Sequence, residues 1–363
     1  MAVRIEPARD SGTAGNIVAA LVRKARAAQK VFVRSTQEQL DEAATAVGWA
    51  IMNPAHNQAL AELAVKDTGL GVVADKIAKN HRKTLGLLRD LQGAKSTGII
   101  ADYPERGITE IARPVGVVAA VVPSTNPAAT PANNIINALK CGNAVILSPS
   151  PRGTSTSTLL LQYVHAELNR VGAPADLVLQ LPAPVTRELT AELMKQADLV
   201  VVTGSQNNVR AGYSSGTPAL GVGTGNVAVI VDDSADCADA ARKIMASKVF
   251  DNATSCSSEN SVIIHDKVYA RMTASLAKEG GALLTAAEKE TLRKAMFPGG
   301  KLSPAVTAQP VKKICAAAGL IRAELVNAKC LMVEETGAGR EFPFSGEKLS
   351  PVLTVYRARD FDH

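Results

Sequence analysis

The sequence predicts an α/β protein of two domains, built on parallel sheets with crossover helices. A chain of 363 residues exceeds the size at which one hydrophobic core usually stops growing. Residues 115–122 form a short, valine-rich apolar run, which is typical of a strand buried on both faces. Between about residues 142 and 232, strand-like and helix-like segments alternate, and this alternation indicates a parallel sheet.

The first ninety residues have the periodicity of helices. Leu40, Ala44, Val47 and Ile51 recur at three- and four-residue steps, which predicts one apolar helix face. A second apolar face, interrupted at His81, is expected to consist of Val73, Ile77, Leu85 and Leu88.

From residue 98 the pattern changes to strands, and then to strands alternating with helices. The expected strands are 99–100, 115–122, 143–147, 176–179, 198–202 and 261–264, and the expected helices are 154–171, 184–196, a short one from about 205, and 235–249. A change of composition near residue 232 suggests the domain boundary. In parallel sheets, ligands bind at the carboxyl ends of the strands.

The composition argues against several classes of protein. Although the net charge is +6, aromatic residues are 3% and no dense Lys/Arg block occurs, so nucleic-acid binding is not expected. No apolar run approaches the roughly 20 residues of a membrane helix, and charges within residues 1–10 argue against a signal peptide. Five cysteines without CxxC pairs fit a reducing cytoplasm better than disulfides or zinc. The histidines show no metal-ligand spacing, so no metal site is expected.

Cys256 is the candidate nucleophile. It lies in a polar loop of small residues between an expected helix and an expected strand, where a thiol is accessible. The alternative is a small apolar filler, which is the usual role of an isolated cysteine.

Two loops that follow expected strands carry further candidates. Asn126, in Pro123-Ser-Thr-Asn-Pro127, has an amide that can donate to a developing oxyanion, although a proline-defined turn explains it equally. The segment Thr203-Gly-Ser205 opens a helix, so it suits either a phosphate or an ordinary N-cap.

The glycines at 221, 223 and 225 superficially match a dinucleotide fingerprint. The strand-like run 227–231 follows them where that motif requires a helix. We therefore expect Gly221 and Gly223 to permit a tight turn or a close backbone approach to a ligand.

Taken in order, these segments resemble the aldehyde dehydrogenase superfamily, especially its coenzyme A-acylating branch. The resemblance covers nearly the whole chain, and each piece is weak alone. The matching segments are Arg113-Pro-Val-Gly116, Pro123-Ser-Thr-Asn-Pro127, Ser148-Pro-Ser-Pro151, Thr203-Gly-Ser205, Gly221-Val-Gly-Thr-Gly-Asn226, the Cys256 loop and Glu347-Lys-Leu-Ser-Pro-Val352. It implies that residues 1–232 hold a helical region and an NAD(P)-binding domain, and residues 233–363 a catalytic domain.

The resemblance also implies roles for single residues. Cys256 would attack an aldehyde, and its own N–H and the Asn126 side chain would hold the resulting oxyanion. The implied cofactor contacts are Ser148, Pro149 and Ser150 near the adenosine, Thr203, Gly204 and Ser205 near the pyrophosphate, Gly221 and Gly223 by close approach, and Glu347 near the nicotinamide ribose. No acid suited to a ribose 2′-hydroxyl follows strand 143–147 and Arg152 could meet a 2′-phosphate, so NAD and NADP both stay open.

One departure from the family's pattern indicates the product. Hydrolytic members carry a glutamate that activates water, where this chain has Gly221-Val-Gly-Thr-Gly225. Coenzyme A, whose thiol needs less activation than water, is therefore the expected acyl acceptor. The alternatives are a hydrolytic enzyme with another base, an acyl-phosphate reductase, and a non-catalytic relative.

Segment 123–131 is most similar to the same segment of sulfoacetaldehyde dehydrogenases and of the aldehyde domain of bifunctional aldehyde–alcohol dehydrogenases. This resemblance implies sulfoacetaldehyde or another short aldehyde as substrate. The resemblance also implies a homo-oligomer. Related enzymes continue beyond the point that corresponds to His363, so their closing segment is expected to be absent here.

Overall fold

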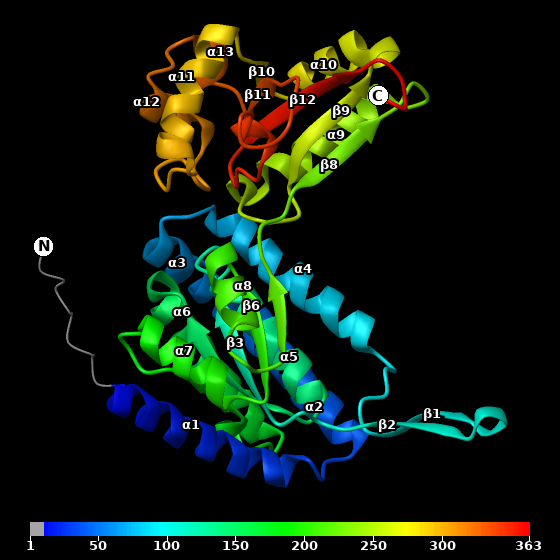
Figure 1. Cartoon of the computed structure of the whole chain (residues 1–363), viewed down its shortest axis with the longest axis vertical. Coiled ribbons are helices and arrows are strands. Elements are labelled where there is room, and N and C mark those ends of the chain that lie inside the picture. The colour runs from blue at the N-terminus through cyan, green and yellow to red at the C-terminus, as the bar shows by residue number, and fades with distance from the viewer. Residues whose placement is uncertain (1–10) are drawn as a thin grey trace, which may run out of the picture. The chain divides into compact units, whose positions relative to one another are not determined.

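The computed structural model describes residues 11–363. The charged residues on which the argument against a signal peptide rests are within residues 1–10 and lie outside the described part. The described chain divides into two compact units. The first unit contains residues up to Gly69 and Lys76–Gly223, and the second contains Leu70–Asp75 and Thr224–His363. Figure 1 labels elements of both units where there is room. No helix within residues 11–363 combines the length and the apolar composition needed to cross a membrane.

The first unit begins with helices, as the periodicity predicts. Thr36 and Gln39 form a capping box that starts the second helix, and Gly69, in the left-handed conformation with φ 68°, ends the third. The residues Leu40, Ala44, Val47 and Ile51 are buried as expected. These helices are α1 (Ser11–Phe32), α2 (Gln37–Met52), α3 (Pro54–Thr68) and α4 (Val73–Leu91).

The apolar face expected on α4 is buried only in part: Leu88 packs against the core of the first unit, but the prediction is wrong for Leu85. Leu85 is 50% exposed, whereas Lys76, Lys79, Asn80 and Thr84 are buried. In α4, hydrophobic periodicity therefore identifies the helix but only part of the side that it buries.

The rest of the first unit is a two-stranded ribbon and a five-stranded parallel sheet with helices. The ribbon is β1 (Gly98–Tyr103) and β2 (Ile108–Ala112), paired antiparallel. The sheet has the order β5-β4-β3-β6-β7. Its elements are β3 (Val117–Val122), α5 (Ala129–Lys140), β4 (Ala144–Pro149), α6 (Thr154–Arg170), β5 (Val178–Gln180), α7 (Arg187–Gln196), β6 (Leu199–Thr203), α8 (Gln206–Tyr213) and β7 (Ala219–Val222).

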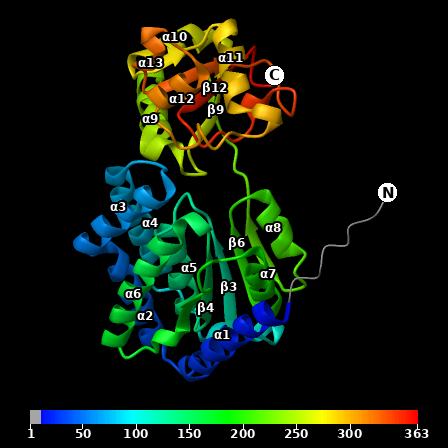
Figure 2. The same ribbon diagram turned by 90° about the vertical axis from the view of Figure 1, so that its left-hand side faces the viewer.

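The order of the strands places a crevice in this sheet. The chain runs outward from β3 through β4 to β5 and then returns to add β6 and β7 on the other side of β3. Right-handed crossovers then place α5 and α6 on one face and α7 and α8 on the other. Consistent with this, α2 packs against both α5 and α6, and α1 against α7 (Figure 2). The direction of winding reverses between β3 and β6, and such a switch point is where parallel sheets bind ligands.

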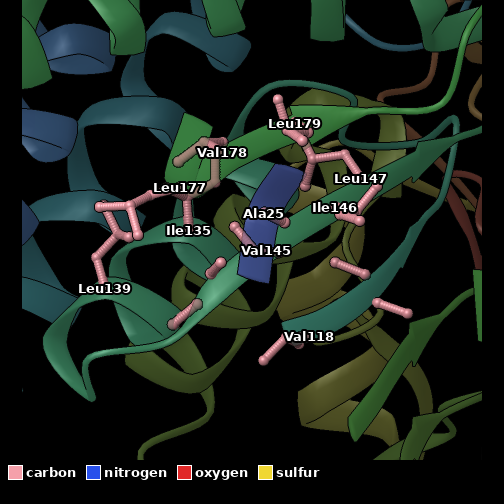
Figure 3. Packing of buried hydrophobic residues seen from close by; sticks show 14 of the residues in the cluster. Ala25, Val118, Ile135, Leu139, Val145, Ile146, Leu147, Leu177, Val178 and Leu179 are labelled. Atoms are coloured by element: carbon pink, nitrogen blue, oxygen red, sulfur yellow. The ribbon is translucent and has the colours of Figure 1, made fainter. Parts of the chain in front are cut away.

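The core of the first unit is mainly apolar around its central strands. Every residue of β3 and β4 is buried. Figure 3 shows Val145, Ile146 and Leu147 of β4 among apolar side chains from Leu177–Leu179 and from Ile135 and Leu139 of α5. The expectation of a strand buried on both faces is confirmed for Val117–Val122. It is wrong for Ile99 and Ile100, which lie in the two-stranded ribbon and are exposed.

The second unit is also built on a five-stranded parallel sheet, with the order β10-β11-β12-β9-β8. Strand 227–231, which the sequence analysis placed within the first region, pairs here with β9. Its elements are β8 (Val227–Val231), α9 (Cys237–Val249), β9 (Glu259–His265), α10 (Tyr269–Lys278), β10 (Gly281–Leu283), α11 (Ala286–Met296), α12 (Val311–Ala318), α13 (Ala323–Val326), β11 (Cys330–Glu334) and β12 (Val352–Ala358).

Candidate active site

A pocket in the second unit contains Cys256 and Glu347. It lies where three strands begin: Gly225 precedes β8, the Cys256 loop precedes β9, and the segment with Glu347 precedes β12. The pocket is therefore at the amino ends of these strands, opposite to the edge where parallel sheets usually bind ligands. Its lining residues are Gly225, Val227, Lys248, Ala253, Ser255, Cys256, Ser258, Asn260, Glu347 and Leu349.

The Cys256 thiol is set apart from the other four cysteines by its surroundings. Cys256 is exposed, whereas Cys237, Cys315 and Cys330 are buried, and all five are free. Burial raises the pKa of Cys330 to about 11, and it also raises the pKa of Cys315 and of Cys141. Because the thiolate is the reactive form, these three thiols are poor nucleophiles, and Cys256 is the accessible one that lines a pocket.

Gly225 lets the Cys256 loop and Glu347 approach each other closely. A Cβ at position 225 would lie 2.9 Å from the carbonyl oxygen of Cys256 and 3.5 Å from Oε1 of Glu347. The same Oε1 accepts a hydrogen bond from the Gly225 N–H at 3.3 Å. Burial raises the pKa of Glu347, although the Gly225 N–H and the charge of Lys248 act in the opposite direction.

Two asparagines tie together the segments that form the pocket. Asn260 Nδ2 donates to Asn226 Oδ1 at 2.7 Å and to the Gly346 carbonyl at 2.7 Å, and Asn226 Nδ2 donates to the Ser345 carbonyl at 2.9 Å. Lys348 is fully buried, and its ammonium donates to the carbonyls of Phe344 and Asn260 at 2.6 and 3.1 Å. These bonds fix the segment that carries Glu347.

The backbone just before Cys256 is unusual. Asp251, Asn252 and Ala253 have φ values of 52°, 50° and 57°, so three successive non-glycine residues are left-handed. Such residues are strained and persist only where the surroundings hold them. Here the Asp251 N–H donates to Asp75 Oδ2 at 2.7 Å, and Asp251 Oδ1 accepts from the Val72 N–H at 2.7 Å.

Lys248, at the end of α9, is a pocket residue that the sequence analysis did not identify. Its side chain is buried, and burial lowers its pKa to about 8, although Cys330, Glu259 and Glu347 favour the charged form. A lysine in the last turn of a helix is usually explained by the helix dipole, so its position gave no signal of a pocket role. Its ammonium would stabilise anions that form in the pocket.

The other predicted site residues lie in the first unit, along the carboxyl edge of its sheet. The register aligns Ser148 with Val121, Val121 with Val202, and Val202 with Gly221 across four strands. Pro149 ends β4 and Ser150 follows it, while Thr203 ends β6, so these residues lie along the same edge. Asn126 is in the loop that follows β3, the strand between β4 and β6.

Several of the predicted residues along this edge make contacts within the fold. Ser205 caps α8, since its Oγ accepts from the Asn208 N–H at 3.3 Å, and Gly204 N donates to the Val222 carbonyl at 3.1 Å. A Cβ at Gly221 would lie 2.6 Å from Val209, and one at Gly223 would lie 2.3 Å from Gln206. These two glycines therefore allow the chain to pack closely against α8.

The chain matches a family model and is similar to known proteins over nearly its whole length. The aldehyde dehydrogenase family model matches residues 10–341. The chain is 61% identical, over 98% of its own length and 72% of the relative's, to a sulfoacetaldehyde dehydrogenase (acylating) from Cupriavidus necator.

Solved structures are similar as well. An acetylating aldehyde dehydrogenase from Geobacillus thermoglucosidasius has a TM-score of 0.91 and 34% identity, with 98% of this chain and 78% of that chain covered. A propionaldehyde dehydrogenase from Rhodopseudomonas palustris, solved with bound CoA and an acylated cysteine, has a TM-score of 0.82 and 26% identity, with 95% and 78% covered. The chain belongs to the aldehyde dehydrogenase family.

Proposed function

We propose that this chain oxidises an aldehyde to an acyl-CoA, with NAD or NADP as hydride acceptor and Cys256 as nucleophile. The observation that carries the proposal is the Cys256 pocket, in which an exposed thiol lies beside Glu347 and a buried lysine. Segment 221–225 has no glutamate at the position where hydrolytic members of the family carry one to activate water. This supports the choice of CoA as acyl acceptor.

In this mechanism the Cys256 thiolate attacks the aldehyde carbon, and the carbonyl electron pair moves to oxygen to give a thiohemiacetal. The Cys256 N–H and the Asn126 amide hold the oxyanion. When the oxyanion collapses, the hydrogen on carbon leaves as hydride and a thioester remains on Cys256. The CoA thiolate then attacks the thioester, the acyl-CoA departs, and the Cys256 thiolate is regenerated.

The first unit fits a dinucleotide at its carboxyl edge. The winding of its sheet reverses between β3 and β6, and α8 begins at that edge with Ser205 as its cap. Ser148, Pro149, Ser150, Thr203, Gly204 and Ser205 would hold the cofactor there, and in the second unit Glu347 would contact its nicotinamide ribose. The bound nicotinamide supplies the hydride acceptor.

The test is mass spectrometry of the chain incubated with aldehyde and NAD(P)⁺ but no CoA. An acyl adduct on Cys256 that disappears when CoA is added, with acyl-CoA formed, is the expected result. Cys256→Ala should give no adduct, whereas Cys141→Ala, which removes the other exposed cysteine, should leave it intact. A folded protein without an adduct contradicts the proposal, and discharge by water at the same rate would favour hydrolysis to the free acid.

We infer sulfoacetaldehyde as the aldehyde, because the 61% identical relative carries that name. The measurement is kcat/KM for sulfoacetaldehyde against acetaldehyde and propionaldehyde under one set of conditions. Equal values for the three aldehydes would contradict this choice.

We also infer that the chain assembles as a homo-oligomer in the cytoplasm. The β1–β2 ribbon supports assembly, since Ile99, Ile108 and Ile111 are 60%, 49% and 52% exposed, and an isolated two-stranded ribbon is marginally stable. The five free cysteines fit a reducing compartment. Light scattering of Ile108→Asp should show smaller particles than the unchanged chain, and an unchanged mass would contradict the role of the ribbon.

A further inference from the structure

The buried face of α4 brings two lysines to the loop that carries Asn126. Lys76 and Lys79 are only 4% and 3% exposed. Lys76 Nζ donates to the Thr125 carbonyl at 3.2 Å, and Lys79 Nζ donates to Asn126 Oδ1 at 3.1 Å. Burying an ammonium group is unfavourable unless it is hydrogen-bonded, and both lysines are hydrogen-bonded to this loop.

The contact with Lys79 fixes which way the Asn126 amide faces. A lysine ammonium has three donors and no acceptor, so the Asn126 atom that faces it must be the carbonyl oxygen. The amide nitrogen, with its two N–H donors, is therefore turned away from Lys79. The oxygen and nitrogen of an asparagine amide are nearly the same in size, so their assignment depends on the hydrogen-bond network, and here the lysine decides it.

That orientation matters for an oxyanion donor. With the amide reversed, Oδ1 would face the developing negative charge and repel it. With Oδ1 held by a cation, the N–H groups are available and are polarised toward stronger donation. Preorganised donors stabilise a transition state because they need no rearrangement when the charge forms.

We propose that Lys79 is a positioning residue that holds the Asn126 amide with its N–H groups available to the thiohemiacetal oxyanion. The proposal rests on the proposed function, because it requires Asn126 to be an oxyanion donor. Lys79 itself transfers no proton and forms no bond to the substrate.

The test is a double-mutant cycle on Lys79 and Asn126, read as the single-turnover rate of NAD(P)H formation without CoA. Removing an oxyanion donor, as in Asn126→Ala, should lower this rate by about 10²–10³-fold. Lys79→Met should lower it by at least about tenfold, because the amide loses its fixed orientation. In the Asn126→Ala background, Lys79→Met should have less than about a twofold effect, because its partner is already gone.

Two control variants separate positioning from folding. Lys140→Met removes another buried lysine of the same unit, 3% exposed and ion-paired with Asp41, and should leave the single-turnover rate of the folded protein unchanged. Lys79→Arg keeps a cation and should recover part of the rate lost in Lys79→Met. Thermal unfolding of each variant sets the temperature at which the rates are compared.

The outcomes separate this inference from the proposed function. Losses that multiply in the double variant, or a Lys79→Met rate equal to that of the unchanged protein, overturn the role of Lys79 alone. If Asn126→Ala keeps the full rate, the oxyanion role of Asn126 fails, and the inference fails with it. If neither the unchanged protein nor any variant forms the Cys256 thioester, the proposed function itself fails.

Discussion

Both units use a five-stranded parallel sheet, but the central strands of the first sheet and the pocket edge of the second bury different kinds of side chain. In the first unit all residues of β3 and β4 are buried, and their side chains are apolar apart from that of Ser148. In the second unit the pocket edge buries Lys248, Lys348 and Asp251 completely or almost completely. The comparison teaches that an apolar sheet can specify a fold, whereas a reactive site requires buried polar groups that burial itself opposes.

The largest expected effect is in the apolar sheet. Ile146→Ala should lower the free energy of unfolding by about 4 kcal/mol, since Ile146 is fully buried among the side chains of Figure 3 and the truncation leaves a cavity. Urea unfolding measures the change. The matched control is Ile230→Ala in β8, where the side chain is 65% exposed and the loss should be below about 0.5 kcal/mol. Equal losses at the two positions would contradict the contrast in burial.

The second effect has the opposite sign, because it removes a buried charge. Lys248 is protonated below pH 8 in both the folded and the unfolded state, so the full cost of burying its charge is present there. As pH rises from 8 toward 10.5, the folded state releases its proton first and the native protein gains stability. Lys248→Met should therefore be more stable than the unchanged chain by about 3 kcal/mol at pH 7, and by little near pH 10.5.

Urea unfolding at pH 7 and at pH 10 measures this difference. Lys348→Met is the informative control, because the Lys348 ammonium donates to the Phe344, Gly346 and Asn260 carbonyls. Burial lowers the pKa of Lys348 as well, but its removal leaves three carbonyls without this donor, so Lys348→Met should be about 2 kcal/mol less stable relative to the unchanged chain than Lys248→Met is. If Lys248→Met is less stable than the unchanged chain at pH 7, then the surroundings of the Lys248 ammonium compensate its charge better than its burial indicates.

The same contrast explains how far the sequence analysis could go. Valine-rich runs and strand–helix alternation identified β3, β4, β5 and β6, because those strands follow apolar patterning. Cys256 and Glu347 line one pocket. Cys256 was a candidate from its polar loop and received its role from the family resemblance, whereas Glu347 was identified through the resemblance alone.

Three features gave no readable signal. The polar face of α4 was missed because its apolar positions form a competing stripe, and Leu85 on that stripe is half exposed. Lys248 was missed because its partners are distant in sequence. The left-handed turn at Asp251–Ala253 was missed because no glycine or proline marks it.

The smallest effect tests whether strain in that turn serves the site. Ala253 has φ 57°, a conformation in which its Cβ is unfavourable, so Ala253→Gly should raise the free energy of unfolding by about 1 kcal/mol. Asn252→Gly, at φ 50°, should gain less, because asparagine tolerates this conformation better and its side chain donates to the Ala308 carbonyl at 3.2 Å.

The added backbone freedom at position 253 should also slow thioester formation several-fold, because the turn leads directly to Cys256 and a nucleophile must be held in place to react efficiently. Urea unfolding and single-turnover kinetics on the same preparations give both quantities. If Ala253→Gly is more stable and equally fast, then the left-handed turn is a local packing solution, and the positioning of Cys256 depends on Gly225 and the asparagine contacts instead.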